Sequence, residues 1–123
     1  MAQEITVTAR LSVSKGFLVQ KTDPGTILVD MSGTTAIGGA QDIGTSTNAE
    51  AITMSDVSSA GYAFFRNTDT TNFVEIGTGT GVSFAPFLKL KAGEAAVCRL
   101  GTNAPTAKAN VAAVKLQYYI IAD

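Results

Sequence analysis

The chain has 123 residues, of which 46% are hydrophobic and 15% are charged, and its formal net charge is −1. This length suits one globular domain with its own core, and the hydrophobic content argues against a disordered chain. The small net charge gives no basis for binding nucleic acid or membranes, and no apolar run approaches the ~18 residues of a membrane-spanning helix. A single globular domain spanning residues 1–123 is therefore expected.

The first predicted strand covers residues 5–13, where apolar side chains alternate with Thr, Arg and Ser. A period of two is typical of a strand that buries one face on a core. Lys15 and Gly16 then break the pattern, and residues 17–21 form a short extended run. The Asp-Pro-Gly sequence at residues 23–25 predicts a turn, and a second strand is expected over residues 26–31.

Residues 32–48 are rich in Gly, Thr and Ser, which predicts a long loop with at most one weak strand. Further strands are predicted at residues 51–55, 62–67, 73–77, 87–90, 95–100 and 111–121. A loop containing Pro105 is expected between the last two of these strands, and for the alanine-rich residues 104–113 a short helix remains an alternative. The whole pattern predicts an all-β fold, namely an antiparallel β-sandwich, jelly-roll-like, with about eight short strands.

The sequence contains no histidine, so the commonest general base and the usual zinc ligand are missing. The Gly-rich residues 77–81 lack the Lys-Ser/Thr pair of a phosphate loop, and residues 69–72 lack the carboxylates of a calcium loop. The single cysteine, Cys98, lies in an apolar run and is expected to be a small buried side chain. We therefore expect a non-enzymatic protein with no catalytic residue, no metal site and no cofactor.

Four large apolar side chains fall on strand faces that the alternation assigns to solvent: Phe73, Phe87, Tyr119 and Ile121. Such residues usually contact either a loop of the same chain or another subunit, and the sequence leaves both alternatives open. The charged share of 15% is below the ~25% of average soluble domains, which also indicates a covered surface. These four residues are the predicted interface of a homo-oligomer, with a Thr-rich monomer as the alternative.

Two segments, GYAFFRNTDTTNFVEIG at residues 61–77 and PFLKLKAGEAAVCRL at residues 86–100, resemble small β-sandwich virion proteins of tailed bacteriophages. The resemblance implies a capsid decoration or cement protein that stabilises the shell through contacts between subunits. It implies a place on the capsid surface of the virion after synthesis in the host cytoplasm. The implied partners are the major capsid protein or other virion proteins.

Two other functions remain open at this point. Within the same class, the chain is also compatible with a tail, neck or fibre subunit. From another class, a carbohydrate-binding β-sandwich is the alternative. The absence of tryptophan, which stacks well on sugars, counts against this last function.

Overall fold

The computed structural model describes residues 2–123, and the chain divides into two compact units, Met1–Gly33 and Thr34–Asp123. Regular structure in both units is almost entirely antiparallel β-strand, which confirms the predicted all-β class. Among the described residues the one helical element is the short 3-10 helix Gly81–Ser83. No helix in this part of the chain is long and apolar enough to cross a membrane.

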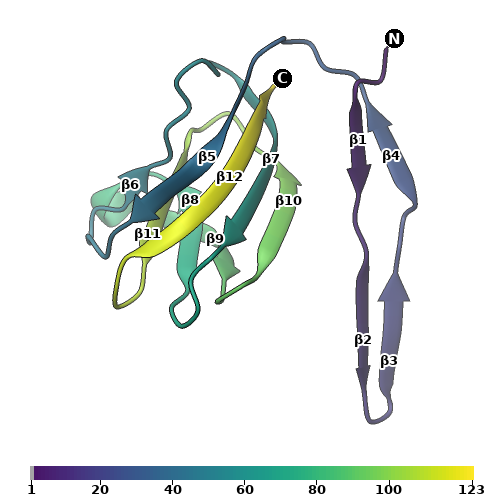
Figure 1. Ribbon diagram of the computed structural model, residues 1–123, viewed down its shortest axis with the longest axis horizontal. Helices are drawn as coiled ribbons and strands as arrows, with labels where there is room; N and C mark the ends of the chain where they lie inside the picture. Colours follow the sequence, from purple (N-terminus) through teal and green to yellow (C-terminus); the bar gives the residue numbers. More distant parts are fainter. Residues whose placement is uncertain (1) are drawn as a thin grey trace. The chain divides into compact units, whose positions relative to one another are not determined.

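The first unit is a long β-hairpin (Figure 1). Its strands are β1 (Ile5–Thr8), β2 (Leu11–Lys15), β3 (Leu18–Thr22) and β4 (Thr26–Val29), with β1 paired to β4 and β2 paired to β3. A two-residue turn joins β2 to β3, and its first residue, Gly16, has a φ of 56°. Glycine adopts this conformation without strain, as tight hairpin turns require.

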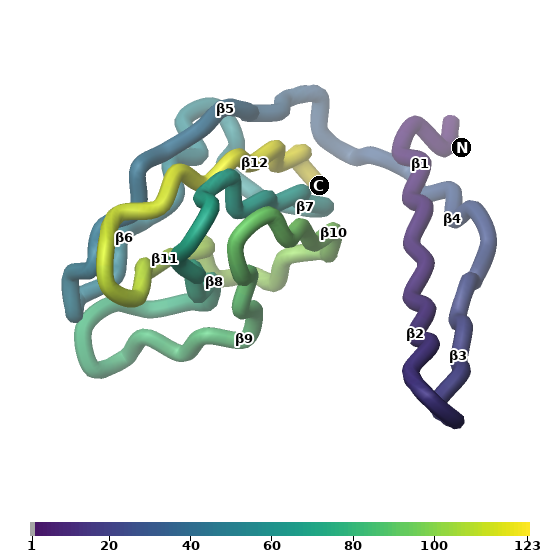
Figure 2. The backbone as a smooth tube through the Cα atoms, turned by 60° about the horizontal axis from the view of Figure 1, so that its bottom comes forward, coloured from purple at the N-terminus to yellow at the C-terminus, as the bar shows by residue number. Residues whose placement is uncertain are grey.

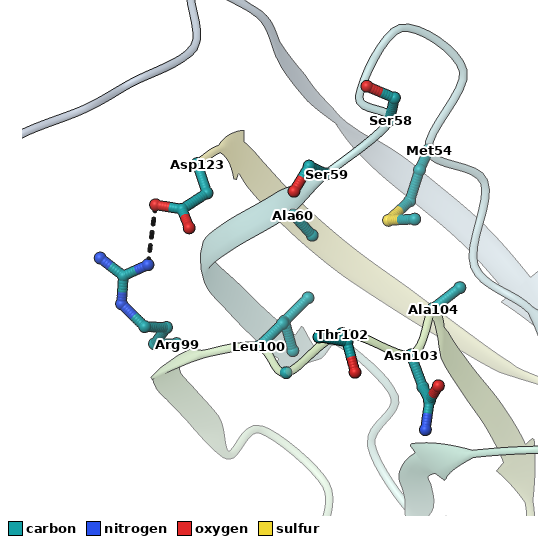
Figure 3. Close-up of a pocket in the computed structure, with 11 residues that line it drawn as sticks. Met54, Ser58, Ser59, Ala60, Arg99, Leu100, Thr102, Asn103, Ala104 and Asp123 are labelled. Atoms are coloured by element: carbon teal, nitrogen blue, oxygen red, sulfur yellow. Dashed lines mark hydrogen bonds and ion pairs between the residues drawn. The ribbon is translucent and has the colours of Figure 1, made fainter.

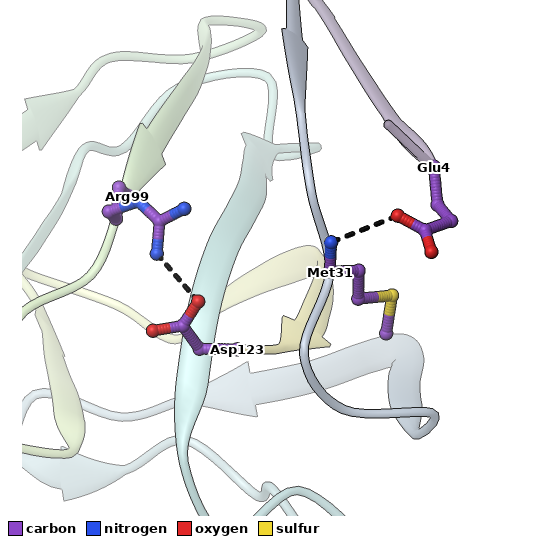
Figure 4. Close-up of polar contacts among 4 residues, drawn as sticks. All are labelled: Glu4, Met31, Arg99 and Asp123. Carbon is purple, nitrogen blue, oxygen red and sulfur yellow. Dashed lines mark hydrogen bonds and ion pairs between the residues drawn. The ribbon is translucent and has the colours of Figure 1, made fainter. Parts of the chain in front are cut away.

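Two carboxylates tie the hairpin strands together beyond β1 and β4. The carboxylate of Glu4 accepts the backbone N–H of Met31 at 3.0 Å (Figure 4), and this bond lowers the pKa of Glu4. The carboxylate of Asp30 accepts the backbone N–H of Gln3 at 2.9 Å. Both bonds link opposite strands, so they fix the pairing of the two chain segments where the hairpin begins.

The structure divides the predicted strand at residues 5–13 into β1 and β2, and only β1 has a buried face. Ile5 and Val7 are buried, whereas Leu11 is 77% exposed and Val13 is 41% exposed. The expectation that this whole segment lies on a core is therefore wrong for its second half. Alternation shows that a strand has an apolar face, but it does not show that another layer covers that face.

The second unit is a sandwich of two antiparallel sheets, seen as two layers in Figures 1 and 2. Sheet I has the order β5-β12-β7-β10 and contains β5 (Ala36–Ile43), β12 (Val114–Ala122), β7 (Ala60–Asn67) and β10 (Ala95–Arg99). Sheet II has the order β6-β11-β8-β9 and contains β6 (Glu50–Ala51), β11 (Pro105–Ala109), β8 (Val74–Thr78) and β9 (Ala85–Leu90).

The strand order of the second unit is that of a jelly roll. In residues 34–123, all of which are described, consecutive strands lie in different sheets except β8 and β9, which form a hairpin. The first and last strands, β5 and β12, are neighbours in sheet I, and β6 and β11 are neighbours in sheet II. Two Greek keys wound in this way define the jelly roll, so the predicted sandwich type is confirmed.

The core of the second unit lies between the two sheets. Alternate residues of β12 are buried, as are the facing residues of β8 and β11, because each strand turns every second side chain inward. The largest completely buried apolar side chains are Phe65, Ile43, Ile76, Leu116, Ile120, Val74 and Val114.

The prediction of a loop with at most one weak strand over residues 32–48 is wrong, because β5 spans eight residues and pairs with β12 along its whole length. Its glycines contribute to the packing. A Cβ atom at Gly38 would lie 2.6 Å from Cδ2 of Tyr119, so only glycine leaves room for that ring. The Gly-rich composition therefore reflects a close approach between strands and not a loop. The prediction of a loop around Pro105, with a short helix as the alternative, is also wrong, because β11 forms there.

Asn67 stabilises the loop that joins β7 to β8. Its side chain is completely buried, and the amide nitrogen donates to the carbonyl oxygens of Asn72 at 2.8 Å and Leu90 at 2.9 Å. The amide oxygen accepts the backbone N–H of Asp69 at 2.8 Å. A buried amide with all these partners holds the loop against the end of β9.

The carboxylate of Asp69 supports the same loop and makes it sensitive to acid. It accepts the backbone N–H groups of Asn72 at 2.6 Å and Thr71 at 2.9 Å, and these bonds lower the pKa of Asp69. The stabilisation is present above the unfolded pKa, about 3.9, and is lost as the pH falls through the lower folded pKa.

We expect the unfolding temperature of the protein to fall on acidification below about pH 4, and to fall less steeply for Asp69→Asn. Thermal unfolding followed by circular dichroism between about pH 2 and pH 6 measures this difference. Asp56→Asn, at an exposed position, is the control and should retain the acid sensitivity of the wild type. An identical pH dependence for wild type and Asp69→Asn would contradict this role of Asp69.

Candidate functional site

An apolar row crosses three neighbouring strands, β12, β7 and β10, on the outer face of sheet I. Tyr119 of β12 pairs with Gly38 of β5 and with Phe64 of β7, and Phe64 pairs with Val97 of β10. Paired residues lie on the same face, and here that face is opposite to the core. Tyr119 is 49% exposed and Val97 is 48% exposed, whereas Phe64 is half-buried between them. We term Tyr119, Phe64 and Val97 the apolar row.

The absence of a side chain at Gly38 leaves a hollow beside the apolar row. Tyr119 covers part of the glycine, and a shallow hollow of about 600 Å³ is lined by Gly38, Phe64, Gln117 and Tyr119, among others. An open hollow next to exposed aromatic rings is a suitable receptor for an apolar side chain from another surface.

Polar residues border the apolar row on both sides. On one side, Gln117 of β12 pairs with Arg66 of β7. On the other side, the guanidinium of Arg99 lies 4.7 Å from the ring centroid of Tyr62 and 2.9 Å from the carboxylate of Asp123 (Figure 4). The bond to Asp123 raises the pKa of Arg99. An apolar centre with a polar rim is the usual anatomy of a protein interface.

The four residues predicted as an interface lie on two different sheets. Tyr119 and Ile121 share the outer face of β12 in sheet I, where Tyr119 belongs to the apolar row and Ile121 is half-buried beside it. Phe87 is 60% exposed on β9 of sheet II. Phe73 precedes β8, and the ammonium group of Lys89 lies 4.1 Å from the centroid of its ring. The structure thus brings Tyr119 and Ile121 together and places Phe73 against a lysine of its own chain.

The outer face of sheet II has a different character. Glu75 of β8 pairs with Lys89 of β9 and with Lys108 of β11, so a row of alternating charge crosses three strands. Its edge strand β9 also contains Pro86, and proline and lysine on an edge discourage pairing with further strands. Apart from the exposed Phe87, sheet II is therefore suited to contact with water, and sheet I presents the larger apolar surface.

The hairpin is a second surface with exposed apolar residues, and the sequence reasoning missed it. Lys15 pairs with Leu18, Val13 with Gln20 and Leu11 with Thr22, so one face of β2 and β3 carries all three aliphatic side chains. Leu11 is 77% exposed, Val13 41% and Leu18 58%. A two-stranded hairpin is only marginally stable in water by itself.

The opposite face of β2 and β3 is mostly polar. Ser12 pairs with Lys21, and Ser14 pairs with Val19. The turn places Phe17 at the tip with its ring completely exposed. The signal that could have revealed this hairpin is the two-residue Gly16-Phe17 turn between two amphipathic segments.

Comparisons of the chain with family models, with curated proteins and with solved structures give no match. A function must therefore be argued from the surfaces themselves. The apolar row and the apolar face of the hairpin are the two that depart most from an ordinary solvated surface.

A polar cavity lies at one end of the sandwich, between the loop before β7 and the loop after β10. It has a volume of about 300 Å³, and its lining includes Ser59, Thr102, Asn103 and the Arg99–Asp123 pair (Figure 3). These groups offer hydrogen bonds to a polar ligand. Among residues 2–123 no group of three or more His, Cys, Asp or Glu residues could hold a metal ion.

Cys98, on β10, is half-buried, and burial raises the pKa of its thiol. A raised thiol pKa leaves little thiolate at neutral pH, and thiolate is the reactive form of cysteine. The sequence predicted a small buried side chain, and the structure places Cys98 half-buried on β10.

Proposed function

We propose that the protein is a non-enzymatic structural component of a bacteriophage virion, namely a capsid decoration or cement protein that stabilises the shell through contacts between subunits. The observation that carries this proposal is the hairpin, on which Leu11 and Leu18 are more than half exposed and Phe17 is completely exposed. Contiguous exposed apolar residues on an extended β-hairpin are typical of an assembly contact.

The jelly-roll fold supports this proposal without being sufficient for it. Viral capsid proteins use this architecture, but so do lectins and enzymes, so the fold alone does not distinguish these functions. The surfaces favour assembly because the apolar row and the hairpin face are both open and uncharged at their centres. Only 15% of the residues are charged, and this low proportion also favours a surface that is covered in an assembly.

The experiment that tests this proposal is binding to virus particles. Purified protein is mixed with particles from which it has been removed, and cosedimentation is followed for capsids and for isolated tails. We expect saturable binding to capsids and a higher temperature of capsid disruption when the protein is bound. Binding to tails or necks would assign the protein to that alternative class, and no binding to any particle would refute the proposal.

A second candidate function, carbohydrate binding, is favoured by the polar cavity beside Arg99 and Asp123. Its hydroxyl and amide groups could bond to sugar hydroxyls, although no aromatic ring is part of its lining. A glycan screen tests this function, with Asn103→Ala as the variant expected to lose binding. Glycan binding without particle binding would favour this candidate over the virion component.

A further inference from the structure

The open apolar surface of the hairpin lies on β2 and β3. Leu11, Val13 and Leu18 occupy one face of these two strands, whereas Ile5 and Val7 on β1 are buried. Residues 9–24 are all exposed, so the surface extends over this whole part of the hairpin. The result is a long and narrow apolar strip.

The outer face of sheet I has the shape and chemistry to receive such a strip. The apolar row crosses its centre, and a shallow hollow borders Tyr119. Two β-layers pack face to face about 10 Å apart when apolar side chains interdigitate. A hairpin laid on sheet I would form a third layer and would cover Tyr119 and Val97.

We propose that the protein assembles with a second copy of itself, and that the apolar face of one copy's hairpin packs on the outer face of the other copy's sheet I. This inference deepens the proposed function and rests on its premise that the hairpin is an assembly element. Every copy contains one hairpin and one sheet I. When two copies pack reciprocally, each hairpin covers the sheet I of the other copy, so both of these surfaces are covered in the dimer.

The area available is enough for an interface only when both contacts form. A two-stranded ribbon over the exposed residues 9–16 and their partners is about 26 Å long and roughly 10 Å wide, so one face covers on the order of 250 Å². With one hairpin and one sheet I covered, each copy buries on the order of 500 Å², so a dimer reaches the ~1,000 Å² in total that a specific interface needs. A single contact gives about half of this area, which favours reciprocal exchange.

The first test is the mass of the purified protein, measured by light scattering coupled to size-exclusion chromatography. We expect a dimer, and a particle of 12.7 kDa at every concentration would overturn the inference. This result is independent of particle binding. A monomer that binds capsids would leave the proposed function intact, and an oligomer that binds no particle would leave the inference intact.

Two variants separate the two surfaces. Leu11→Asp combined with Leu18→Asp places charges on the apolar face of the hairpin, and Tyr119→Lys places one in the apolar row. Both variants should dissociate to monomers. The controls are Ser12→Asp with Ser14→Asp, on the opposite hairpin face, and Val111→Lys, at an exposed position between β11 and β12; both should remain oligomers.

Mixing the two monomeric variants tests whether the hairpin contacts sheet I directly. The hairpin variant retains an intact sheet I, and the Tyr119→Lys variant retains an intact hairpin, so the mixture can form one contact that neither variant forms alone and should give heterodimers at high concentration. A mixture that stays monomeric at every concentration would overturn the inference, and so would a Tyr119→Lys variant that remains an oligomer, which is the result expected when hairpins pair with hairpins. Unchanged far-ultraviolet circular dichroism of each variant is required, since it separates loss of assembly from loss of folding.

Discussion

Asn67→Ala is expected to lower the free energy of unfolding by about 3–5 kcal/mol. The substitution removes the amide that bonds to the carbonyl oxygens of Asn72 and Leu90 and to the N–H of Asp69. Because residue 67 is completely buried, these backbone groups would lose a partner in a place that water reaches poorly. Losing three hydrogen bonds at one buried site should lower the stability more than an ordinary substitution at the surface does.

Urea denaturation measures this change, with the midpoint and the slope fitted separately. Asn103→Ala is the matched control, because Asn103 is exposed in the loop after β10, and its loss should change stability by less than about 0.5 kcal/mol. Equal stabilities of the two variants would show that the amide of Asn67 does not hold the loop.

Gly77→Ala is expected to lower the free energy of unfolding by about 2–4 kcal/mol, because the atoms nearest to the added methyl group are backbone atoms that cannot shift without distorting the sheet. A Cβ atom there would overlap the carbonyl oxygen of Ala85 and lie 2.6 Å from Cα of Pro86. Both atoms belong to the backbone of β9, at the point where the pairing of β8 and β9 shifts register. The extra methyl group would force the two strands of this hairpin apart.

The matched control for this substitution is Gly101→Ala. No atom lies within 4 Å of the position of a Cβ at Gly101, so the alanine should be neutral or slightly stabilising. Thermal unfolding of the two variants side by side gives the comparison. A Gly77→Ala protein as stable as the control would contradict the close approach between β8 and β9.

The sequence predicted the strands whose alternation reflects a core beneath them. β12 is the clearest case, because Val114, Leu116 and Ile120 are buried at a period of two. β5 was missed because its sequence resembles a loop, and what makes it a strand is the ladder with β12. Pairing with a partner more than seventy residues away along the sequence leaves no local signal.

The candidate interface was predictable only within single strands. Tyr119 and Ile121 are two residues apart on β12, so the period of two places them on one face without knowledge of the fold. Phe64 and Val97 lie beside Tyr119 because of the pairing register of β7 and β10, and this register cannot be derived from the sequence. The hairpin was misassigned because an amphipathic strand has the same pattern whether its apolar face lies on a core or stays exposed.

The position of β12 in sheet I has a consequence for biosynthesis. This strand lies between β5 and β7 and pairs with both, although it follows them by many residues in the chain. At about 5–20 residues per second, the ribosome releases β5 and β7 seconds before the strand that unites them. Until residues 114–122 emerge, the apolar side of the sheet has a gap at its centre, and the nascent chain is a candidate for chaperone binding. Folding of the sandwich is thus expected to be a late and slow event, governed by contacts between distant segments.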